Sequence, residues 1–332
     1  MAMITHGTQS GLNQGWTYRD RITVAQAGVS VVAYYADRYR HSSREEWAQR
    51  LAAGQLYRNG QALQRDAVLA PGDHLEYHRP PWVEPSVPLD FDVIYEDADL
   101  LVIVKPAGLP VLPGGPFLTH TLLHQLRHRY PDETPYPVHR LGRGTSGLML
   151  LARSPLARSV LSQQLRQDTA TAEDPQAPHH IVKTYRALAE PGDLPNRFTL
   201  TTPIGPVDHP WLGQVYAASP DGRFALSHGQ VIQRSPTANL VEVTIRTGRP
   251  HQIRIHLAAA GYPLLGDPLY GVGGHPKIRS VPDQRIPVPG DLGYWLQAHH
   301  LTLAHPRTQA PMAFTCPLPM PEPEAVVVRP LP

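Results

Sequence analysis

The sequence is poor in cysteine and has no long apolar run. Its 332 residues include one cysteine, Cys316, so no disulfide can form within the chain, and nothing suggests a disulfide-rich secreted scaffold. No apolar stretch approaches the length that crosses a bilayer. The first sixteen residues lack the charged start and apolar core of a signal peptide. The sequence therefore predicts a globular protein of the cytoplasm with no membrane partner.

Lysine is also scarce. Only Lys105, Lys183 and Lys277 occur among the 30 cationic residues, so the remaining 27 are arginines, and the net charge is +2. Arginine binds phosphates through its planar fork and stacks on bases, which lysine cannot do. A GC-rich genome raises arginine, proline and alanine together, however, and the 37 prolines fit that explanation. The arginine count alone therefore does not establish a nucleic-acid partner.

The first eighty residues predict a small helix-helix-hairpin module behind a polar tail. Residues 1–16 are expected to be a disordered tail, and the module spans 17–80. Apolar spacing predicts a helix over Thr23–Arg38, and Ser42 or Ser43 can cap a second helix that Gly54 ends. Asn59-Gly60 then predicts a hairpin turn, and a further strand follows the turn at 71–73. The Pro-rich segment 81–90 is the expected linker to the next domain.

The rest of the chain, 91–320, predicts one larger domain followed by a tail at 321–332. Its strands and helices mix without a strict β-α-β alternation, which favours an α+β fold around a mixed, largely antiparallel sheet with flanking helices. Strands are expected at 91–96, 100–105, 146–153, 181–190, 240–248 and 294–305, and helices at 119–130, 155–167 and 249–261. Residues 167–180 are expected to be a mobile, acidic surface loop, and 191–238 is loop-rich.

Four segments of this domain are dense in residues that carry chemistry. They are "VIVKPAGLPVLPGG" (102–115), "HRLGRGTSG" (139–147), "KTYRA" (183–187) and "GRPHQIRIHLAAAGYPLLGDPLYG" (248–271). In this order and spacing they resemble the RluA-like pseudouridine synthases, and the resemblance covers about 91–320. Segment 17–80 resembles, more weakly, the alpha-L RNA-binding fold, on "SREEWAQRLAAGQLYRNG" and "PGD". The resemblance implies the pseudouridine synthase fold preceded by an RNA-binding domain.

The resemblance also implies a reaction and its residues. A uridine is swung out of structured RNA, its glycosidic bond is cut, and C5 of the turned uracil bonds to the sugar, without metal or cofactor. Arg140 matches the residue that fills the gap left by the flipped base. Tyr185 matches the tyrosine on which the uracil stacks, and its alternation with Lys183 on one strand face favours a cleft wall. Arg254 matches the arginine that pairs with the catalytic carboxylate.

Other residues of the same motifs complete the predicted site. His139, Arg143, Lys183, Arg249 and His251 are expected to contact RNA, with His139 favoured as a hydrogen-bonded loop histidine over an acid or base. Lys105 and Asp267 match residues that support the fold. The RNA itself is expected to be ribosomal or transfer RNA, the protein a monomer, and no obligate protein partner is expected.

One position departs from the resemblance. The family pattern has Asp after His-Arg-Leu, where this chain has Gly142, which cannot act as nucleophile, base or ion-pair partner. Three hypotheses stay open: a synthase that uses another carboxylate or an activated water, an RNA-binding chaperone or assembly factor without catalysis, or other base chemistry. Asp208, Asp221, Asp267 and Asp99 are candidate substitutes, and none has a spacing that recommends it.

Two other enzyme classes are disfavoured. The 18 histidines suggest a zinc hydrolase, but His251 and His256 are five residues apart, whereas the helical zinc pair needs four with an intervening Glu. His299 and His300 are adjacent on a predicted strand and point to opposite faces. "GRGTSG" lacks the preceding strand and the lysine of a phosphate-binding loop. The sequence therefore predicts neither a metal site nor a nucleotide-binding enzyme.

Overall fold

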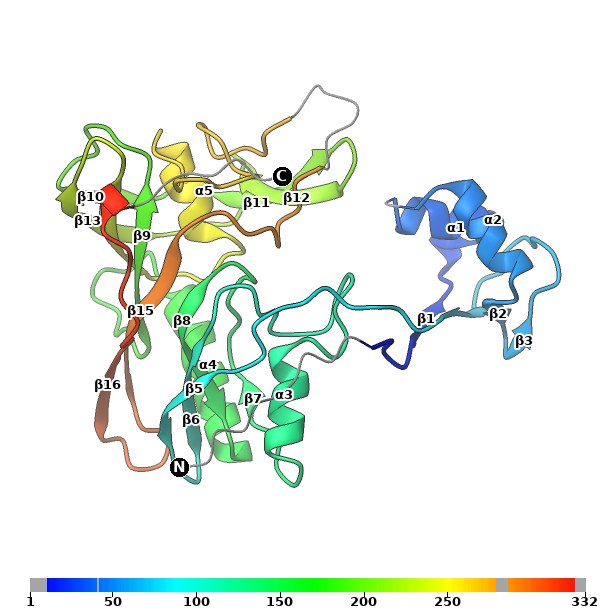
Figure 1. Cartoon of the computed structure of the whole chain (residues 1–332), viewed down its shortest axis with the longest axis horizontal. Helices are drawn as coiled ribbons and strands as arrows, with labels where there is room; N and C mark the ends of the chain where they lie inside the picture. Colours follow the sequence, from blue (N-terminus) through cyan, green and yellow to red (C-terminus); the bar gives the residue numbers. More distant parts are fainter. Residues whose placement is uncertain (1–10, 41, 279–285, 326–332) are drawn as a thin grey trace. The chain divides into compact units, whose positions relative to one another are not determined.

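A computed structural model describes residues 11–40, 42–278 and 286–325. Their contacts divide the chain into two compact units, one running up to Ser86 with 210–213 added, and one formed by the rest of the chain (Figure 1). The division between Ser86 and Val87 falls inside the Pro-rich segment 81–90. No helix of the described residues is both long enough and apolar enough to cross a bilayer.

The first unit is a four-stranded antiparallel sheet with two short helices. The sheet order is β1-β4-β2-β3. Its elements are β1 (Trp16–Arg21), the 3-10 turn η1 (Val24–Gln26), α1 (Val31–Arg38), α2 (Arg44–Ala52), β2 (Leu56–Arg58), β3 (Gln61–Ala62) and β4 (His74–Arg79). Tyr35, Trp47 and Tyr77 form its aromatic centre, with ring centroids 4.6 Å (Tyr35–Trp47) and 4.9 Å (Trp47–Tyr77) apart.

The second helix of this unit and its hairpin agree with the sequence. Ser43 caps α2 by accepting from the backbone N–H of Glu46 at 3.2 Å, and the Glu46 carboxylate accepts from Ser43 N–H at 2.7 Å. Asn59 and Gly60 form the turn between β2 and β3. Short polar caps and turn residues act through their immediate neighbours, so these elements could be predicted locally.

The prediction of one helix over Thr23–Arg38 is wrong. Only a 3-10 turn forms at its start, and α1 begins at Val31 behind Ser30, whose hydroxyl accepts from Ala33 N–H at 3.2 Å. The strand β1 was not predicted. Of the expected tail 1–16, residues 1–10 lie outside the described residues, whereas Asn13 N–H donates to Trp82 O at 3.0 Å and β1 starts at Trp16.

The larger unit is built on a ten-stranded mixed sheet, as the sequence predicts. Its main order is β10-β13-β14-β9-β15-β8-β6-β5, with β16 paired to β15 and β7 to β8. All its pairings are antiparallel except β8 with β15. The strands are β5 (Asp92–Glu96), β6 (Leu100–Lys105), β7 (Tyr136–Pro137), β8 (Ser146–Ala152), β9 (Val182–Ala189), β10 (Arg197–Leu200), β13 (Ser227–Arg234), β14 (Asn239–Ile245), β15 (Leu296–Ala304) and β16 (Pro311–Thr315).

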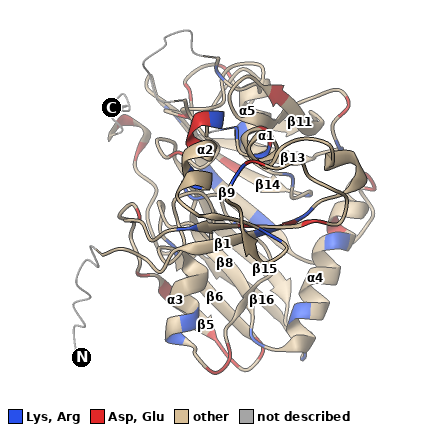
Figure 2. Cartoon of the chain, turned by 90° about the vertical axis from the view of Figure 1, so that its right-hand side faces the viewer, with Lys and Arg blue, Asp and Glu red and all other residues tan. Residues whose placement is uncertain are grey.

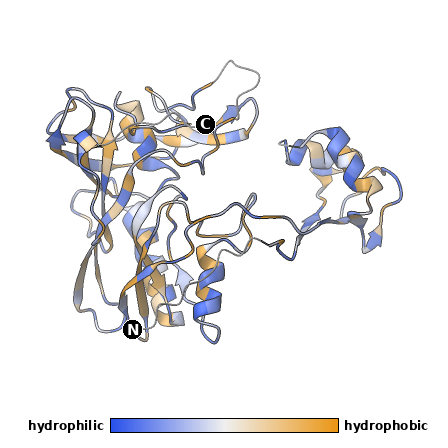
Figure 3. Ribbon diagram, in the orientation of Figure 1, coloured by the Kyte–Doolittle hydropathy of each residue, from blue (hydrophilic) through white to orange (hydrophobic). Residues whose placement is uncertain are grey.

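Three helices accompany this sheet: α3 (Leu122–Arg129), α4 (Pro155–Ala170) and α5 (Gln252–Ala259). A separate hairpin, β11 (Ile204–His209) and β12 (Gly213–Ala218), and the 3-10 turn η2 (Pro323–Ala325) complete the fold. All of β6 and most of β8 are buried, and Leu122 and Leu126 of α3 join the same core. Figure 3 shows hydrophobic and hydrophilic residues on different sides of α3.

A glycine permits the one parallel pairing. Gly147 has φ +102°, and a Cβ there would lie 2.3 Å from the carbonyl oxygen of Ala298 on β15. Because no side chain fits this approach, Thr145-Ser146-Gly147 must end in glycine for β8 to enter the sheet beside β15. This places the loop 139–145 directly ahead of the sheet's central strands.

The prediction of a mobile loop over 167–180 is also wrong at its start, and its end is fixed by hydrogen bonds. The helix α4 continues to Ala170, and the Asp168 side chain is buried. Its carboxylate accepts from the backbone N–H groups of His180 at 2.8 Å and Ile181 at 3.0 Å. The segment is therefore tied back to the start of β9, the strand that carries Lys183 and Tyr185.

Candidate functional site

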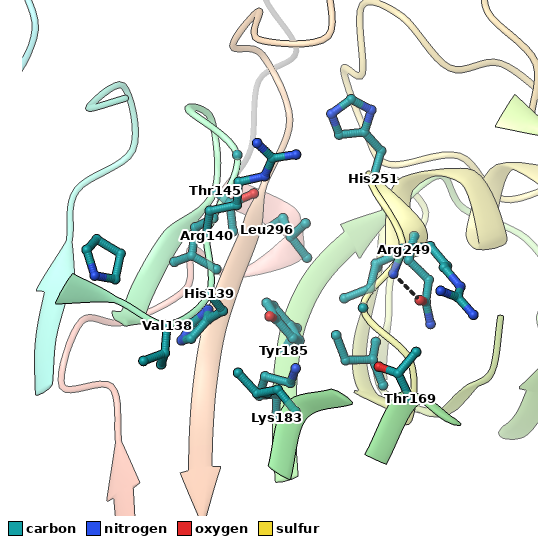
Figure 4. A pocket seen from close by; sticks show the side chains of 18 of the residues that line it. Val138, His139, Arg140, Thr145, Thr169, Lys183, Tyr185, Arg249, His251 and Leu296 are labelled. Carbon is teal, nitrogen blue, oxygen red and sulfur yellow. Dashed lines mark hydrogen bonds between the residues drawn. The ribbon is translucent and has the colours of Figure 1, made fainter. Parts of the chain in front are cut away.

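A cavity of about 710 Å³ lies in the larger unit between the loop 138–142, the strand β9, the helix α4 and the segment 248–254. Figure 4 shows His139 and Arg140 on one side, Arg249 and His251 on the opposite side, and Tyr185 with Lys183 between them. These side chains come from segments that span more than a hundred residues of sequence. The sheet order explains their meeting, because β9 pairs with β14 and β15, and β15 pairs with β8.

The structure brings together all but one of the predicted site residues. The cavity is lined by His139, Arg140, Gly142, Lys183, Tyr185, Arg249, His251 and Arg254. Arg143 does not line it. Its Nε donates to the carbonyl oxygen of Gly290 at 2.7 Å, and its guanidinium lies 5.2 Å from the centroid of Phe117. The prediction that Arg143 contacts RNA is not supported by this placement, because the side chain is used within the fold.

Tyr185 forms part of the cavity wall and of the hydrophobic core behind it. It lies on β9, opposite Val243 of β14 and Ala298 of β15, and its side chain is 7% exposed. Burial raises the pKa of its phenol, so the hydroxyl stays protonated at neutral pH. A flat ring presented from a rigid strand is suited to stacking on a base.

Lys183 and His139 line the cavity beside Tyr185, and at neutral pH the lysine is charged and the histidine is neutral. Burial lowers the pKa of Lys183 to about 8, although the Asp168 carboxylate opposes this shift, so the ammonium is charged at neutral pH. Burial, with the Lys183 charge, lowers the pKa of His139 to about 3. The Nε2 of neutral His139 accepts from the backbone N–H of Leu150 at 3.1 Å. His139 thus anchors its loop to β8, as the sequence favoured.

Lys105 supports the loop of Gly142 from below. Its side chain is fully buried at the end of β6, and Nζ donates to the carbonyl oxygens of Pro106 at 2.8 Å, Leu109 at 2.9 Å and Arg143 at 3.3 Å. Burial lowers its pKa to about 7. Three backbone carbonyls from two loops meet at one ammonium, which fits the supporting role expected for this residue.

Arg254 is buried at the floor of the cavity and is firmly held. Its Nε and Nη2 donate to the two oxygens of Asp267 at 2.7 and 2.8 Å, and Nη1 donates to Pro289 O at 2.8 Å. The Asp267 Oδ1 also accepts from the backbone N–H groups of Leu269 and Tyr270. The carboxylate is completely buried, is saturated with donors, and does not line the cavity. It orients Arg254 and is not available to a substrate.

His251 is held in one tautomer by a chain of hydrogen bonds. Its Nδ1 lies 2.7 Å from the hydroxyl of Tyr270, which donates to the carbonyl oxygen of Tyr216 at 2.7 Å. The Tyr270 oxygen therefore accepts from Nδ1–H. Burial and the nearby Arg254 lower the pKa of His251 to about 4, so the ring is neutral and Nε2 is an acceptor. On the same segment, Arg249 Nε donates to Phe224 O at 2.8 Å.

The charge of the cavity is strongly one-sided. Among the described residues its wall contains Arg140, Arg166, Arg249, Arg254 and Lys183, and no aspartate or glutamate. Asp208, Asp221, Asp267 and Asp99 do not line it. Asp99 is bound by the Arg307 guanidinium and the Ser154 hydroxyl, which hold its pKa near 2. None of the candidate substitutes for the missing carboxylate reaches the cavity, and the site is built for an anionic ligand.

Among the residues of the wall that sequence reasoning missed are Arg166 and Tyr294. Arg166 follows Arg158 and Ser162 on one face of α4, and that four-residue spacing was a usable signal. Tyr294 precedes β15, and its ring lies 4.3 Å from the Arg254 guanidinium. No local pattern marks Tyr294, because its position depends on pairing between β15 and β9.

The chain is similar to several known proteins. The model of the family described as RNA pseudouridylate synthase matches residues 99–259. An uncharacterized RNA pseudouridine synthase of Synechocystis is 48% identical over 286 residues, 86% of this chain and 93% of that protein. RNA pseudouridine synthase 5 of rice is 40% identical over 92% of this chain and 88% of its own. The structure titled human RNA pseudouridylate synthase domain containing 1 shares the fold, with a TM-score of 0.51 at 21% identity over 71% of this chain and 87% of that one.

Proposed function

Because the chain belongs to the RluA-like family of pseudouridine synthases, we propose that it isomerises uridine to pseudouridine in RNA, within the cavity that Tyr185 lines. The reaction moves the sugar bond from N1 to C5 of the same uracil, so no atom is gained or lost and no cofactor is needed. The observation that carries the proposal is that Arg140, Tyr185 and Arg254 line one cationic cavity.

Arg140 is proposed to occupy the gap that a flipped uridine leaves. Its side chain is exposed at the edge of the cavity, and it makes no ion pair or side-chain hydrogen bond with the described residues. A guanidinium in this position can donate to the orphaned base and to phosphates. Tyr185 then receives the uracil, and Arg254 supplies positive charge from the floor of the cavity.

The isomerase activity is tested on RNA that lacks the modification. Purified protein added to total RNA from a strain deleted for this gene is expected to restore pseudouridine at one position. Tyr185→Phe is expected to lower the rate at least about 100-fold, because loss of a phenol that takes part in proton transfer typically costs 10²–10⁴-fold. Site-specific pseudouridine mapping is the measurement.

A second tyrosine provides the control. Tyr262→Phe removes a hydroxyl outside the cavity, and we expect its rate to stay within about twofold of wild type. If the wild-type protein binds RNA but forms no pseudouridine, the proposal of catalysis is wrong, and an RNA-binding protein on this scaffold is the explanation.

The bound RNA is expected to follow α4 away from the cavity. Arg158, Ser162 and Arg166 stand on one face of this helix, and the basic positions are visible in Figure 2. A second hollow of about 670 Å³ shares Tyr136, Ser162 and Arg166 with the cavity. Arg158 and Arg166 are exposed and have no carboxylate partner among the described residues, so both are available to backbone phosphates.

Replacing both arginines is expected to change the salt dependence of RNA binding. Arg158→Ala with Arg166→Ala should lower the slope of log K against log salt by about 0.7 for each phosphate that the protein no longer binds, the value for single strands. Arg197→Ala, an exposed arginine on β10, should leave the slope unchanged. Binding titrations at several salt concentrations measure the slope, and an unaltered slope in the double variant contradicts this path.

The titration of Lys183 predicts a pH dependence. With a pKa lowered to about 8, the ammonium is charged below pH 8 and loses its charge as the pH rises through that value. RNA affinity is therefore expected to fall about tenfold across pH 7 to 9, the value of one charged hydrogen bond. Lys183→Arg should remove this decline, and binding titrations across pH measure it. An identical decline in the arginine variant rules out Lys183 as its source.

The first unit is assigned the role of an RNA-binding module. Its helix α2 carries Arg44 and Arg50, and the Arg50 guanidinium lies 4.3 Å from the centroid of Trp47, so the arginine is oriented by the core of the unit. The protein is proposed to act as a monomer in the cytoplasm, without an obligate protein partner, on ribosomal or transfer RNA.

A further inference from the structure

We propose that Tyr294 is a catalytic residue and that its hydroxyl takes the place left free by Gly142. The inference rests on the proposed isomerisation and names the group that acts on the ribose. The atoms beside Gly142 are the first observation that supports it. A Cβ built at that position would have two neighbours within 4 Å, Tyr294 Oη at 3.4 Å and Thr145 Oγ1 at 3.5 Å. Apart from the adjoining residues of the chain, the atom nearest to this Cβ is thus the phenol oxygen.

A second glycine is required for the ring to lie there. At Gly144 a Cβ would stand 2.8 Å from Tyr294 Cζ, 2.9 Å from Oη and 3.0 Å from Cε1. Such distances are below those of real contacts between carbon atoms. Gly144 therefore leaves the room that the Tyr294 ring fills, and Gly142 lies in contact distance of its hydroxyl, so the motif that lacks a carboxylate is also the motif that accommodates this tyrosine.

Tyr294 is buried beside a guanidinium whose position is fixed. The ring is 6% exposed, and the Arg254 guanidinium lies 4.3 Å from its centroid. Arg254 is fixed by Asp267 and Pro289, so its charge stays in place during the reaction. The ring also lines the cavity with Tyr185, on the side of Gly142.

The chemistry balances with the phenol as the nucleophile. As the bond between C1′ and N1 breaks, its electron pair goes to the uracil, Oη bonds to C1′, and the phenol proton moves to the uracil O2. After the uracil turns, C5 attacks C1′ and the electron pair of the Oη–C1′ bond returns to the oxygen. The C5 proton then moves to Oη by way of the Tyr185 hydroxyl, which gives up one proton as it takes the other, and the proton on O2 passes to N1. Tyr294 is regenerated and no co-reactant is consumed.

Tyr294→Phe tests this assignment, because it keeps the ring and removes the oxygen. We expect kcat to fall at least about 100-fold, as for loss of an essential nucleophile, with RNA affinity within about twofold of wild type. Tyr262→Phe is the matched control and should retain wild-type kcat. A Tyr294→Phe variant with near-wild-type kcat, or one whose loss is matched by an equal loss of affinity, overturns the inference.

A carboxylate added at position 142 provides the second variant. With the hydroxyl gone, Gly142→Asp in the Tyr294→Phe background places an oxygen nucleophile in the same space, and kcat should rise at least about tenfold above that of Tyr294→Phe. If the double variant binds RNA and its kcat stays at the level of Tyr294→Phe, a carboxylate at position 142 cannot replace the Tyr294 hydroxyl, and the inference is wrong. If wild-type protein itself forms no pseudouridine, the proposed function fails instead, so the two failures are distinguishable.

Discussion

Asp267→Ala is expected to lower the free energy of unfolding by about 3–5 kcal/mol, the typical result of removing one partner from a buried ion pair. Arg254 is 2% exposed and gives two of its donors to Asp267. Without the carboxylate, the guanidinium keeps its charge in a site that water barely reaches. The backbone N–H groups of Leu269 and Tyr270 lose their acceptor at the same time.

The measurement is chemical denaturation of Asp267→Ala beside a surface control. Asp208→Ala removes an exposed carboxylate that accepts one hydrogen bond from Gln214, and its effect should stay within about 0.5 kcal/mol. The Asp267 variant should also lose activity, because Arg254 would no longer be held beneath the cavity. If both variants unfold alike, the ion pair does not organise the floor of the site.

Elements that depend on their nearest neighbours could be predicted from the sequence. Ser43 with Glu46, and Ser154 with Pro155, mark the starts of α2 and α4, and the structure has both helices there. The alternation of Lys183 and Tyr185 predicted one shared face of β9, and both residues line the cavity. In these cases a cap or a period of two residues is sufficient, because no distant partner is needed.

Elements that depend on distant partners could not be predicted. The segment 167–180 is polar, but Asp168 is buried because it binds the backbone that starts β9. The Tyr294 ring reaches Gly142 and Gly144 across about 150 residues of sequence, through strand pairings that no local pattern specifies. Arg143 lies in the motif but turns to Gly290, which the motif itself could not indicate.

The positive charge of the site could not be predicted from the low net charge of the chain. A value of +2 over 332 residues suggests little about partners. The cavity nevertheless collects four arginines and Lys183 without a carboxylate among its described lining residues. Asp99 is bound by Arg307 away from the cavity, and Asp267 binds Arg254 without lining the cavity itself. Placement rather than total charge creates the local potential that attracts RNA.

Gly144→Ala is expected to lower kcat by about 100-fold, nearly as much as loss of the Tyr294 hydroxyl itself. The added methyl carbon would lie 2.8 Å from Tyr294 Cζ, so the ring must leave its place beside Gly142. Gly144 has no left-handed backbone angle, so alanine meets no conformational penalty there. The cost in stability should be that of overpacking, about 1–3 kcal/mol.

The comparison with other variants separates displacement of the ring from general damage. Gly114→Ala is the control, because a Cβ there has no neighbour within 4 Å and the backbone is not left-handed, and it should keep wild-type kcat. Two substitutions that remove the same oxygen do not add, so Gly144→Ala with Tyr294→Phe should be no slower than Tyr294→Phe alone, within about threefold. If the two losses multiply in this double variant, Gly144 affects catalysis by another route, and the contact between Gly144 and the Tyr294 ring has no part in the reaction.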